Sequence, residues 1–242
     1  MAWVLVAHIA ARSLDGQGVI TPDIDTTGAN LIVIPTAQTT FLTPPPKSPG
    51  DSKGNIYTLV QPYNGPLAGI QFWVCRNPVV GTGHTFNIPP GTILFPSLGV
   101  TAWSGADTSS AFDVQSGAAT FNPALASPGS IVPTQNGDLI LTATVANLGA
   151  PASVAGFTPI DLLASTSQGL GIGVAYAVQN PAAPINPTWN GTGLQASAIV
   201  AFKGATVPPP PTPLVALSLD SVVSIPGGTV TLTLSIASTG GC

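Results

Sequence analysis

The sequence predicts an all-β protein built as a two-sheet antiparallel β-sandwich of jelly-roll-like type, and three observations lead to that prediction. Glutamate is absent, lysine is scarce and no segment keeps a 3.6-residue apolar period, so helices are not expected. The 27 glycines and 26 prolines recur between short apolar runs rich in Val, Ile, Leu and Thr. Such alternation is typical of many short strands joined by tight turns.

The expected strands follow the apolar runs along the chain. In order they are 3–9, 31–36, 56–60, 70–76, 84–88, 97–103, 138–145, 171–178 and 195–202, with weaker candidates near Phe157 and Trp189. The first run belongs to the apolar stretch 2–11, for which a signal peptide is the alternative interpretation. That stretch lacks a positively charged start and His8 interrupts it, so a first strand is favoured and no export signal is expected.

The chain shows signs of an internal duplication. Three motifs of the first half recur in the same order in the second. The apolar run after Gly28 matches the run after Gly137, and segment 69–78 matches 171–181, each ending in Asn-Pro. Segment 100–106 then matches 200–205. Because one half offers too few expected strands to bury both faces, we expect residues 1–206 to form one continuous sandwich.

A proline-rich linker, 207–213 (VPPPPTP), closes that sandwich. The remaining segment, 214–242, alternates apolar and polar residues in two runs and resembles the opening strands of immunoglobulin-like or cohesin-like modules. We expect it to be a short β appendage or assembly arm. Its predicted assembly contact is the row of apolar residues in the second run, Val230, Leu232, Leu234 and Ile236.

Charge is the most unusual property of the composition. The 242 residues include five Lys or Arg and nine acidic residues, all of them Asp, so 6% are charged where about 25% is ordinary. Charge depletion is a property of buried subunit interfaces. Nucleic acid is excluded as a partner because five scattered basic residues cannot follow a phosphate backbone. No apolar run reaches the ~20 residues of a membrane span, so membrane insertion is not expected.

No catalytic, cofactor-binding or metal site is predicted, because no metal-ligand spacing and no nucleophile motif is present. His84 follows a Gly-Thr-Gly turn and is expected to be solvated. Asp23 and Asp25 form a carboxylate pair that suits glycoside hydrolysis or Ca²⁺ binding, and Asp51 with Asn55 suggests a Ca²⁺ loop. Local turns, in which Asp binds its own backbone, are the favoured interpretation of both pairs.

The aromatic residues divide into core and surface candidates. Trp73 and Trp103 lie in apolar strands and are expected in the core, and Cys75 is expected to be a buried thiol. Tyr63 and Trp189 are expected in loops rich in Pro and Asn and are the candidates for glycan contact.

Residues 1–206 resemble β-rich domains of phage virion and bacterial surface proteins. The resemblance rests on the segments 25–31, 51–55, 81–86 and 103–106. It implies a non-enzymatic structural protein of a virion surface, of capsid-decoration or fibre type, whose partners are copies of itself and other assembly proteins. The alternative is a secreted adhesin or carbohydrate-binding module on a bacterial surface, with host-surface glycans as ligands. A hydrolase on a sandwich scaffold is the third hypothesis.

Overall fold

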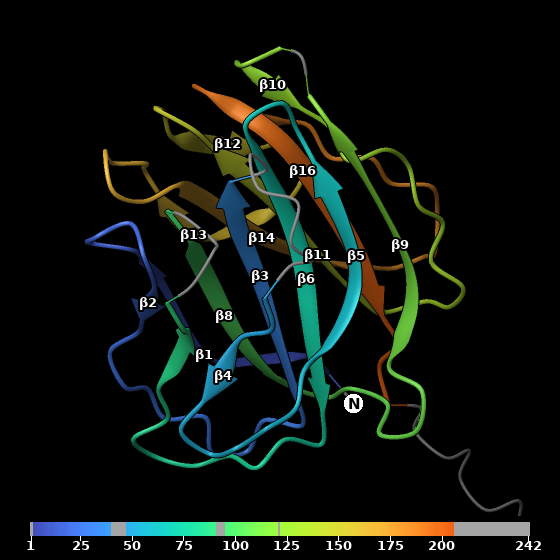
Figure 1. Ribbon diagram of the computed structural model, residues 1–242. Coiled ribbons are helices and arrows are strands. Elements are labelled where there is room, and N and C mark those ends of the chain that lie inside the picture. Colours follow the sequence, from blue (N-terminus) through green and yellow to red (C-terminus); the bar gives the residue numbers. More distant parts are fainter. Residues whose placement is uncertain (1, 40–46, 91–94, 121, 206–242) are drawn as a thin grey trace, which may run out of the picture. The chain divides into compact units, whose positions relative to one another are not determined.

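The computed structural model describes residues 2–39, 47–90, 95–120 and 122–205, and each regular element among them is a β-strand (Figure 1). These residues all belong to one compact unit, Met1–Thr206. The all-β prediction is therefore confirmed. The linker 207–213 and the appendage 214–242, with the predicted contact residues Val230, Leu232, Leu234 and Ile236, lie outside the described residues.

Two five-stranded antiparallel sheets form the middle of this unit. Sheet I runs in the order β1 (Val4–Arg12), β8 (Ser97–Ser104), β3 (Leu31–Thr39), β6 (Ala68–Arg76) and β5 (Thr58–Asn64). Sheet II runs in the order β13 (Thr158–Leu163), β14 (Gly171–Gln179), β11 (Asp138–Ala146), β16 (Leu194–Phe202) and β9 (Phe112–Ala119).

Two three-stranded sheets accompany them. Sheet III contains β2 (Val19–Ile20), β7 (Phe86–Ile88) and β4 (Gly50–Asp51), with β7 in the centre. Sheet IV contains β10 (Leu125–Ala126), β15 (Trp189–Gly191) and β12 (Pro151–Val154), with β15 in the centre.

Both halves of the described chain have the same strand order. If β9 to β16 are matched in sequence to β1 to β8, the order of sheet II is the order of sheet I, and sheet IV likewise repeats sheet III. The registers agree as well, because Leu31 lies between Arg76 and Trp103 as Leu139 lies between Val178 and Phe202. Each half is thus an eight-stranded, jelly-roll-like sandwich of five and three strands, as a duplicated sequence predicts.

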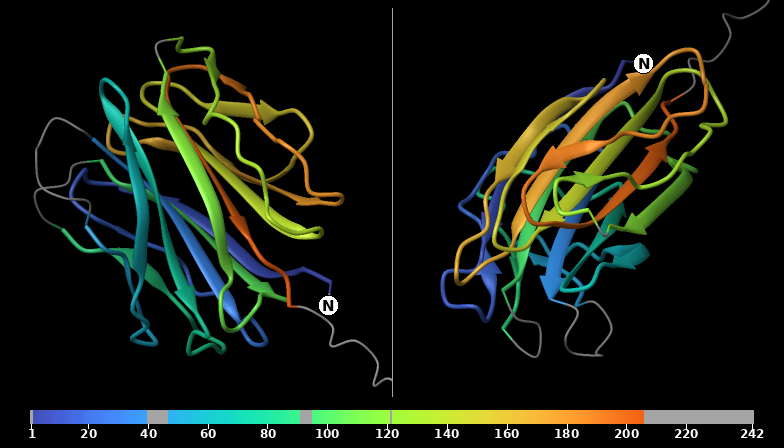
Figure 2. Two further views of the ribbon diagram at one scale, coloured as in Figure 1. Left: turned by 90° about the vertical axis from the view of Figure 1, so that its right-hand side faces the viewer. Right: turned by 90° about the horizontal axis from the view of Figure 1, so that it is seen from above.

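The sheets stack so that apolar cores form between them (Figures 1 and 2). Sheets I and II face each other across a central core that includes Phe72 and Phe202. Sheet III covers the other face of sheet I and buries Phe86 against it, and sheet IV covers sheet II around Trp189. The two halves share the central core, which ties them together through buried apolar area.

The central strands β3, β6, β8, β11 and β16 are buried on both faces, since almost every residue in them is inaccessible to water. Strands covered on both sides become continuously apolar, and such runs are easily recognised in a sequence. For that reason the predicted strands coincide with these elements. The strands that were not predicted are β9, which has no apolar alternation, and short strands of two to four residues such as β2 and β12.

The predicted core residues are confirmed. Trp103 is buried and meets Tyr176 edge to face, with ring centroids 5.0 Å apart. Trp73 is buried and its indole N–H donates to Thr36 Oγ1 over 3.1 Å. Cys75 is buried, and burial followed by nearby Asp51 raises the pKa of its thiol.

Candidate functional site

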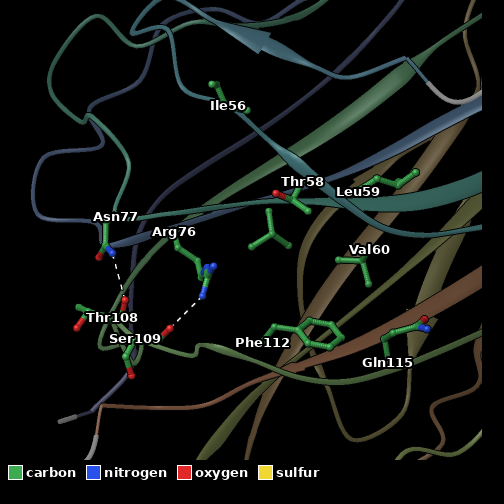
Figure 3. Close-up of a pocket in the computed structure, with 11 residues that line it drawn as sticks. Ile56, Thr58, Leu59, Val60, Arg76, Asn77, Thr108, Ser109, Phe112 and Gln115 are labelled. Carbon is green, nitrogen blue, oxygen red and sulfur yellow. Dashed lines mark hydrogen bonds between the residues drawn. The ribbon is translucent and has the colours of Figure 1, made fainter.

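A groove of about 620 Å³ with a mixed apolar and polar lining lies between β5, the last strand of sheet I, and β9, the last strand of sheet II (Figure 3). Val60 and Val74 contribute apolar side chains from sheet I, and Phe112 does so from sheet II. Ile56 and Phe112 stand at its edge and are 87% and 41% exposed. Large apolar side chains that remain this exposed beside a concave surface are typical of interaction sites.

Polar contacts close the two ends of this groove. At one end Arg76 donates to the carbonyl of Ser109 over 3.1 Å, and Asn77 donates to the carbonyl of Thr108 over 3.2 Å. At the other end the Tyr63 hydroxyl donates to the Gln115 side chain. The groove therefore has fixed walls on both strands and a defined length.

A tight contact at Gly117 brings β9 close to β5. A β-carbon at this position would collide with the ring of Tyr63, so glycine lets the aromatic ring lie directly against the strand. Tyr63 is half-buried within β5, and the expectation that it lies in a loop is wrong. Its position is explained by sheet–sheet packing, while the predicted glycan contact at Tyr63 stays a prediction.

The matching edge of the sandwich, between β1 and β13, is filled. There β14 carries Tyr176 opposite Thr158, where β6 has the smaller Val74 opposite Thr58. The Trp3 indole N–H, just before β1, donates to the carbonyl of Gly137, just before β11, over 2.9 Å. One edge is thus filled by aromatic side chains, whereas its counterpart remains open as the groove.

Arg76 is the one charged residue among those that line the groove. Within the described part of the chain, no carboxylate lies at ion-pair distance from its guanidinium. The end of the groove near Ser109 therefore presents a positive charge without a carboxylate partner, which favours a partner that carries negative charge at this end.

The structure places Trp189 in the core between sheets II and IV. The ring is 0% exposed and its indole N–H donates to Thr142 Oγ1 over 3.0 Å. The prediction that Trp189 lies in a loop and contacts a glycan is wrong for this conformation, because a buried ring has no free face for stacking. The surrounding Pro and Asn residues suggested a loop, whereas Trp189–Gly191 pairs with strands on both sides.

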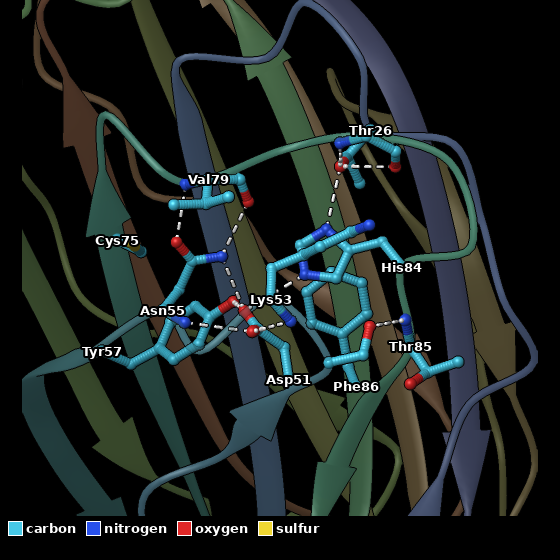
Figure 4. Close-up of polar contacts among 12 residues, drawn as sticks. Thr26, Asp51, Lys53, Asn55, Tyr57, Cys75, Val79, His84, Thr85 and Phe86 are labelled. Carbon is cyan, nitrogen blue, oxygen red and sulfur yellow. Dashed lines mark hydrogen bonds and ion pairs between the residues drawn. The ribbon is translucent and has the colours of Figure 1, made fainter.

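A buried polar network, which the sequence did not predict, lies between sheets I and III (Figure 4). Its centre is Asp51, whose carboxylate accepts hydrogen bonds from the Tyr57 hydroxyl (2.5 Å), the Asn55 amide (2.8 Å) and two backbone N–H groups, the nearer that of Lys53 at 2.9 Å. The turn interpretation of Asp51 and Asn55 is correct, but the same carboxylate also faces a histidine.

That histidine is His84, and its predicted exposure is wrong because the side chain is 0% exposed. Its Nε2 lies 3.2 Å from Asp51 Oδ2, at ion-pair distance but too bent for a hydrogen bond. Its Nδ1 meets Thr26 Oγ1 at 2.9 Å, and the ring stacks on Phe86 with centroids 4.2 Å apart. The Gly-Thr-Gly turn was recognised correctly, but the side chain that follows points inward.

Burial determines the protonation states of this network. Burial lowers the pKa of His84, and the attraction of Asp51 offsets this only in part. Burial alone would raise the pKa of Asp51, but hydrogen bonds from Tyr57 and then Asn55 hold it below its usual range. Burial and the hydrogen bond to Asp51 raise the pKa of Tyr57. Asp51 is therefore ionised near neutral pH, while His84 and Tyr57 are neutral.

Thr26, His84 and Asp51 thus form a hydroxyl–imidazole–carboxylate series, the arrangement that activates a nucleophile in some hydrolases. All three side chains are fully buried. A nucleophile must reach its substrate, so in this conformation the series fixes the sheets and turns of the first half. Among the described residues, no cluster of three or more His, Cys, Asp or Glu side chains could hold a metal ion.

A pair of acidic residues, Asp113 and Asp138, lies where β9 and β11 begin. Asp113 accepts hydrogen bonds from the backbone and hydroxyl of Thr134 (2.7 and 2.6 Å) and lies 3.4 Å from Lys203 Nζ. Asp138 is 0% exposed, and burial together with Asp113 raises its pKa to about 7. Burial and the negative charge of Asp113 both favour the protonated form of Asp138, so the charge of this pair changes with pH.

Comparison with known proteins gave no match to a family model, to a curated protein or to a solved structure. Among the described residues no helix of the length and apolarity needed to cross a membrane was found.

Proposed function

We propose that this protein is a non-enzymatic structural protein of a virion surface, of the capsid-decoration or fibre type, that acts through contacts between subunits. The observation that carries the proposal is the groove between β5 and β9, where Ile56 and Phe112 remain exposed in a chain with only 6% charged residues. Little charge opposes the association of such surfaces, and burial of the apolar side chains drives it. Its partners are copies of itself and other proteins of the assembly.

The fold is compatible with this role. Jelly rolls of eight strands in two sheets recur in viral capsid and lectin domains. This analogy concerns architecture alone, since one fold serves many functions. The specific support comes from the open edge, because the same edge is filled by aromatic side chains at the duplicated position.

Two measurements test the proposal. Sedimentation velocity of the purified full-length protein should show association that increases with concentration, because apolar contacts release water from both partners. Gold-labelled antibodies against the protein should decorate intact native particles in electron micrographs. Absence of the label from every particle, together with a monomer at all concentrations, would show that the proposal is wrong.

The alternative role, a bacterial-surface adhesin or carbohydrate-binding module, is tested separately. Glycan-array binding that Tyr63→Ala abolishes would favour the alternative, because Tyr63 is the half-buried aromatic residue at one end of the groove. Binding of no glycan is the result expected from the proposal.

A further inference from the structure

Three charged residues meet at one end of sheet II. Asp138 begins β11, Asp113 is the second residue of β9, and Lys203 directly follows β16, the strand between those two. The whole chain has five basic and nine acidic residues. Among the described residues, Lys203 is the one Lys or Arg at ion-pair distance from a carboxylate. In a chain with so few charges, an amine beside two carboxyl groups needs an explanation.

The Asp113 carboxyl group and the Lys203 amine are held in contact. The Thr134 backbone N–H donates to Asp113 Oδ2 over 2.7 Å, and the Thr134 hydroxyl donates to Oδ1 over 2.6 Å. Lys203 Nζ lies 3.4 Å from the same Oδ1, and the Asp113 side chain is 1% exposed. The Lys203 backbone N–H donates to the carbonyl of Ala111, which fixes the start of the lysine side chain. The two groups therefore face each other at a site that water barely reaches.

Asp138 places an acid beside this pair. Its side chain is inaccessible to water, and neither of its oxygens accepts a hydrogen bond of ordinary geometry from a described residue. Burial, followed by the interaction with the Asp113 carboxyl group, raises the pKa of Asp138 to about 7. A buried carboxyl group that keeps its proton is a hydrogen-bond donor. Asp138 can therefore give a proton to the carboxyl group that Lys203 faces.

The first half of the chain lacks this arrangement. At the matching positions of sheet I, which the strand registers define, the three side chains are Val6, Asn30 and Ser104. The Asn30 side chain is satisfied by the backbone of Ala106, which both donates to it and accepts from it. The same strand order is thus built without an amine or a carboxyl group at this end, so the fold alone does not explain the cluster in sheet II.

The contacts of the cluster are those that amide formation requires. An amine held against a carboxyl group reacts as if at very high concentration. A neighbouring acid that protonates the reacting carboxyl group makes its carbon more electrophilic and helps an oxygen to leave as water. A backbone N–H, here that of Thr134 at Oδ2, stabilises the negative charge that develops on the remaining oxygen.

We propose that Lys203 Nζ and Asp113 Cγ form an isopeptide bond, with Asp138 as the acid that promotes it. The Lys203 ammonium passes a proton to the Asp113 carboxylate, and the freed lone pair attacks Cγ. The N–C bond forms, the Cγ–Oδ1 bond breaks, and Oδ1 leaves as water with two protons that came from the ammonium group. Asp138 lends a proton to the reacting carboxyl group and regains one, so it ends unchanged, and no oxidant or reductant is needed.

The bond would tie β9, the edge strand of sheet II, to the end of β16. A largely buried ion pair carries a desolvation cost, and the neutral amide removes both charges. The link also closes a long loop, which restricts the unfolded chain as a disulfide does. Burial is the largest cause of the raised pKa of Asp138 and remains in the linked form, so the direction of that shift is unchanged. The inference concerns one molecule and does not depend on the proposed function.

Mass spectrometry of the denatured full-length protein tests the bond. We expect the intact mass to be lower than the sequence mass by one water molecule. Trypsin cuts after Lys and Arg, and the basic residue that precedes Lys203 is Arg76. Because trypsin does not cut at an amide-linked lysine, digestion of the denatured protein should give one fragment, 77–242, in place of 77–203 and 204–242.

Three variants identify the role of each residue. Lys203→Arg keeps the positive charge but lacks the amine, so we expect the full sequence mass. Asp138→Asn keeps the shape of the acid, and we expect the loss of water after synthesis to be about a hundredfold slower or more. The control, Lys53→Arg, makes the same change at a lysine that donates to the carbonyl of Thr82, and it should still lose one water. Circular dichroism checks that each variant keeps its β structure.

Three results overturn the inference in whole or in part. If the unchanged protein has its full sequence mass and is cut after Lys203, the two residues form an ion pair alone. If the protein loses water but is still cut after Lys203, the loss lies elsewhere, for example in a succinimide at Asp15-Gly16. If Asp138→Asn loses water as fast as the unchanged protein, the bond stands and Asp138 is not its acid.

Discussion

The two halves of the sandwich place different side chains at matching positions of their outer cores. In sheet III the partner of Phe86 is Asp51, and in sheet IV the partner of Trp189 is Val154. The residue that precedes β5 is Tyr57, and the residue that precedes β13 is Phe157.

At a third pair of matching positions the first half again has a polar residue and the second half an apolar one. An isolated bridge joins Ile24 to His84 in the first half and Ile131 to Ile185 in the second. The first half therefore has a polar network where the second half has an apolar cluster.

The difference shows that this strand order does not require a particular chemistry in its outer core. In the first half, hydrogen bonds to Asp51 and its close approach to His84 offset the burial of polar groups, and apolar side chains occupy the matching place in the second half. The sequence around Asp51 is also longer than its counterpart, because five residues (SKGNI) separate Asp51 from Tyr57 while two residues separate Val154 from Phe157. The extra residues supply the backbone and Asn55 donors that an ionised carboxylate needs.

Replacing the centre of the polar network should have the largest effect. We expect Asp51→Val alone to lower the free energy of unfolding by about 1–3 kcal/mol for each buried donor that loses its acceptor, chiefly the Tyr57 hydroxyl and the Asn55 amide. The triple variant Asp51→Val, Tyr57→Phe, His84→Ile copies the second half and should lose less than the single variant. Urea denaturation followed by circular dichroism measures both. Equal or greater loss in the triple variant would contradict the equivalence of the two cores.

The acid pair of the second half should give a pH dependence of its own. The pKa of Asp138 rises from 3.8 to about 7 on folding, so the folded state holds a proton that the unfolded chain releases. Stability from this proton is complete below about pH 4 and is lost as pH rises toward 7. Asp138→Asn should flatten the pH profile of unfolding free energy in that window. An unchanged slope would show that Asp138 is not protonated in the fold.

The buried His84 of the first half should change the free energy of unfolding with pH in the opposite direction. Because folding lowers the pKa of His84, its contribution is present above the ordinary value of 6.5 and is lost as pH falls below it. Asp138→Asn should therefore leave a profile in which acidification alone is destabilising across this range. A variant with both Asp138→Asn and His84→Ile should lose this remaining slope near pH 6.

The open edge can be tested at Gly117. We expect Gly117→Val to destabilise the protein by about 1–3 kcal/mol, because the added carbons collide with the ring of Tyr63. In a Tyr63→Ala background the same substitution should cost much less, and Ala119→Val, at an exposed position of β9, serves as the control. Equal costs in both backgrounds would show that the ring does not set this contact.

The smallest expected difference is in the coupling free energy of the polar side-chain pairs at the two edges of the sandwich. His8 Nδ1 lies 3.2 Å from Asp161 across the β1–β13 edge, and His8 is exposed. We expect a double-mutant cycle with alanine to give about 0.2–1 kcal/mol for this pair. The Tyr63–Gln115 hydrogen bond, which is part-buried, should give about 0.5–1.5 kcal/mol. A stronger coupling at the exposed pair would reverse this comparison.

The strands that the sequence predicted are those covered on both faces. β3 and β11 are buried along almost their whole length and contain the apolar runs LIVI and LIL, and the duplicated motifs lie on β3, β6 and β8 and on their counterparts. β9 could not be recognised because its sequence, FDVQSGAA, has no apolar period. It is held by pairing with β16 and by the packing of Tyr63 on Gly117, and both partners are distant in sequence. The groove was missed for the same reason, since β9 forms one of its walls.

The sequence by itself determined the fold class, the duplication, the burial of Trp73, Trp103 and Cys75, and the turn formed by Asp51. These follow from local properties, which are apolar runs, turn residues and short-range hydrogen bonds of Asp.

The tertiary structure decided the rest. It brought His84 to Asp51, buried Trp189 beneath sheet IV and left one edge of the sandwich open while the other was filled. Those outcomes depend on which distant strands become neighbours, and a side chain's exposure is set by what the opposite sheet places above it.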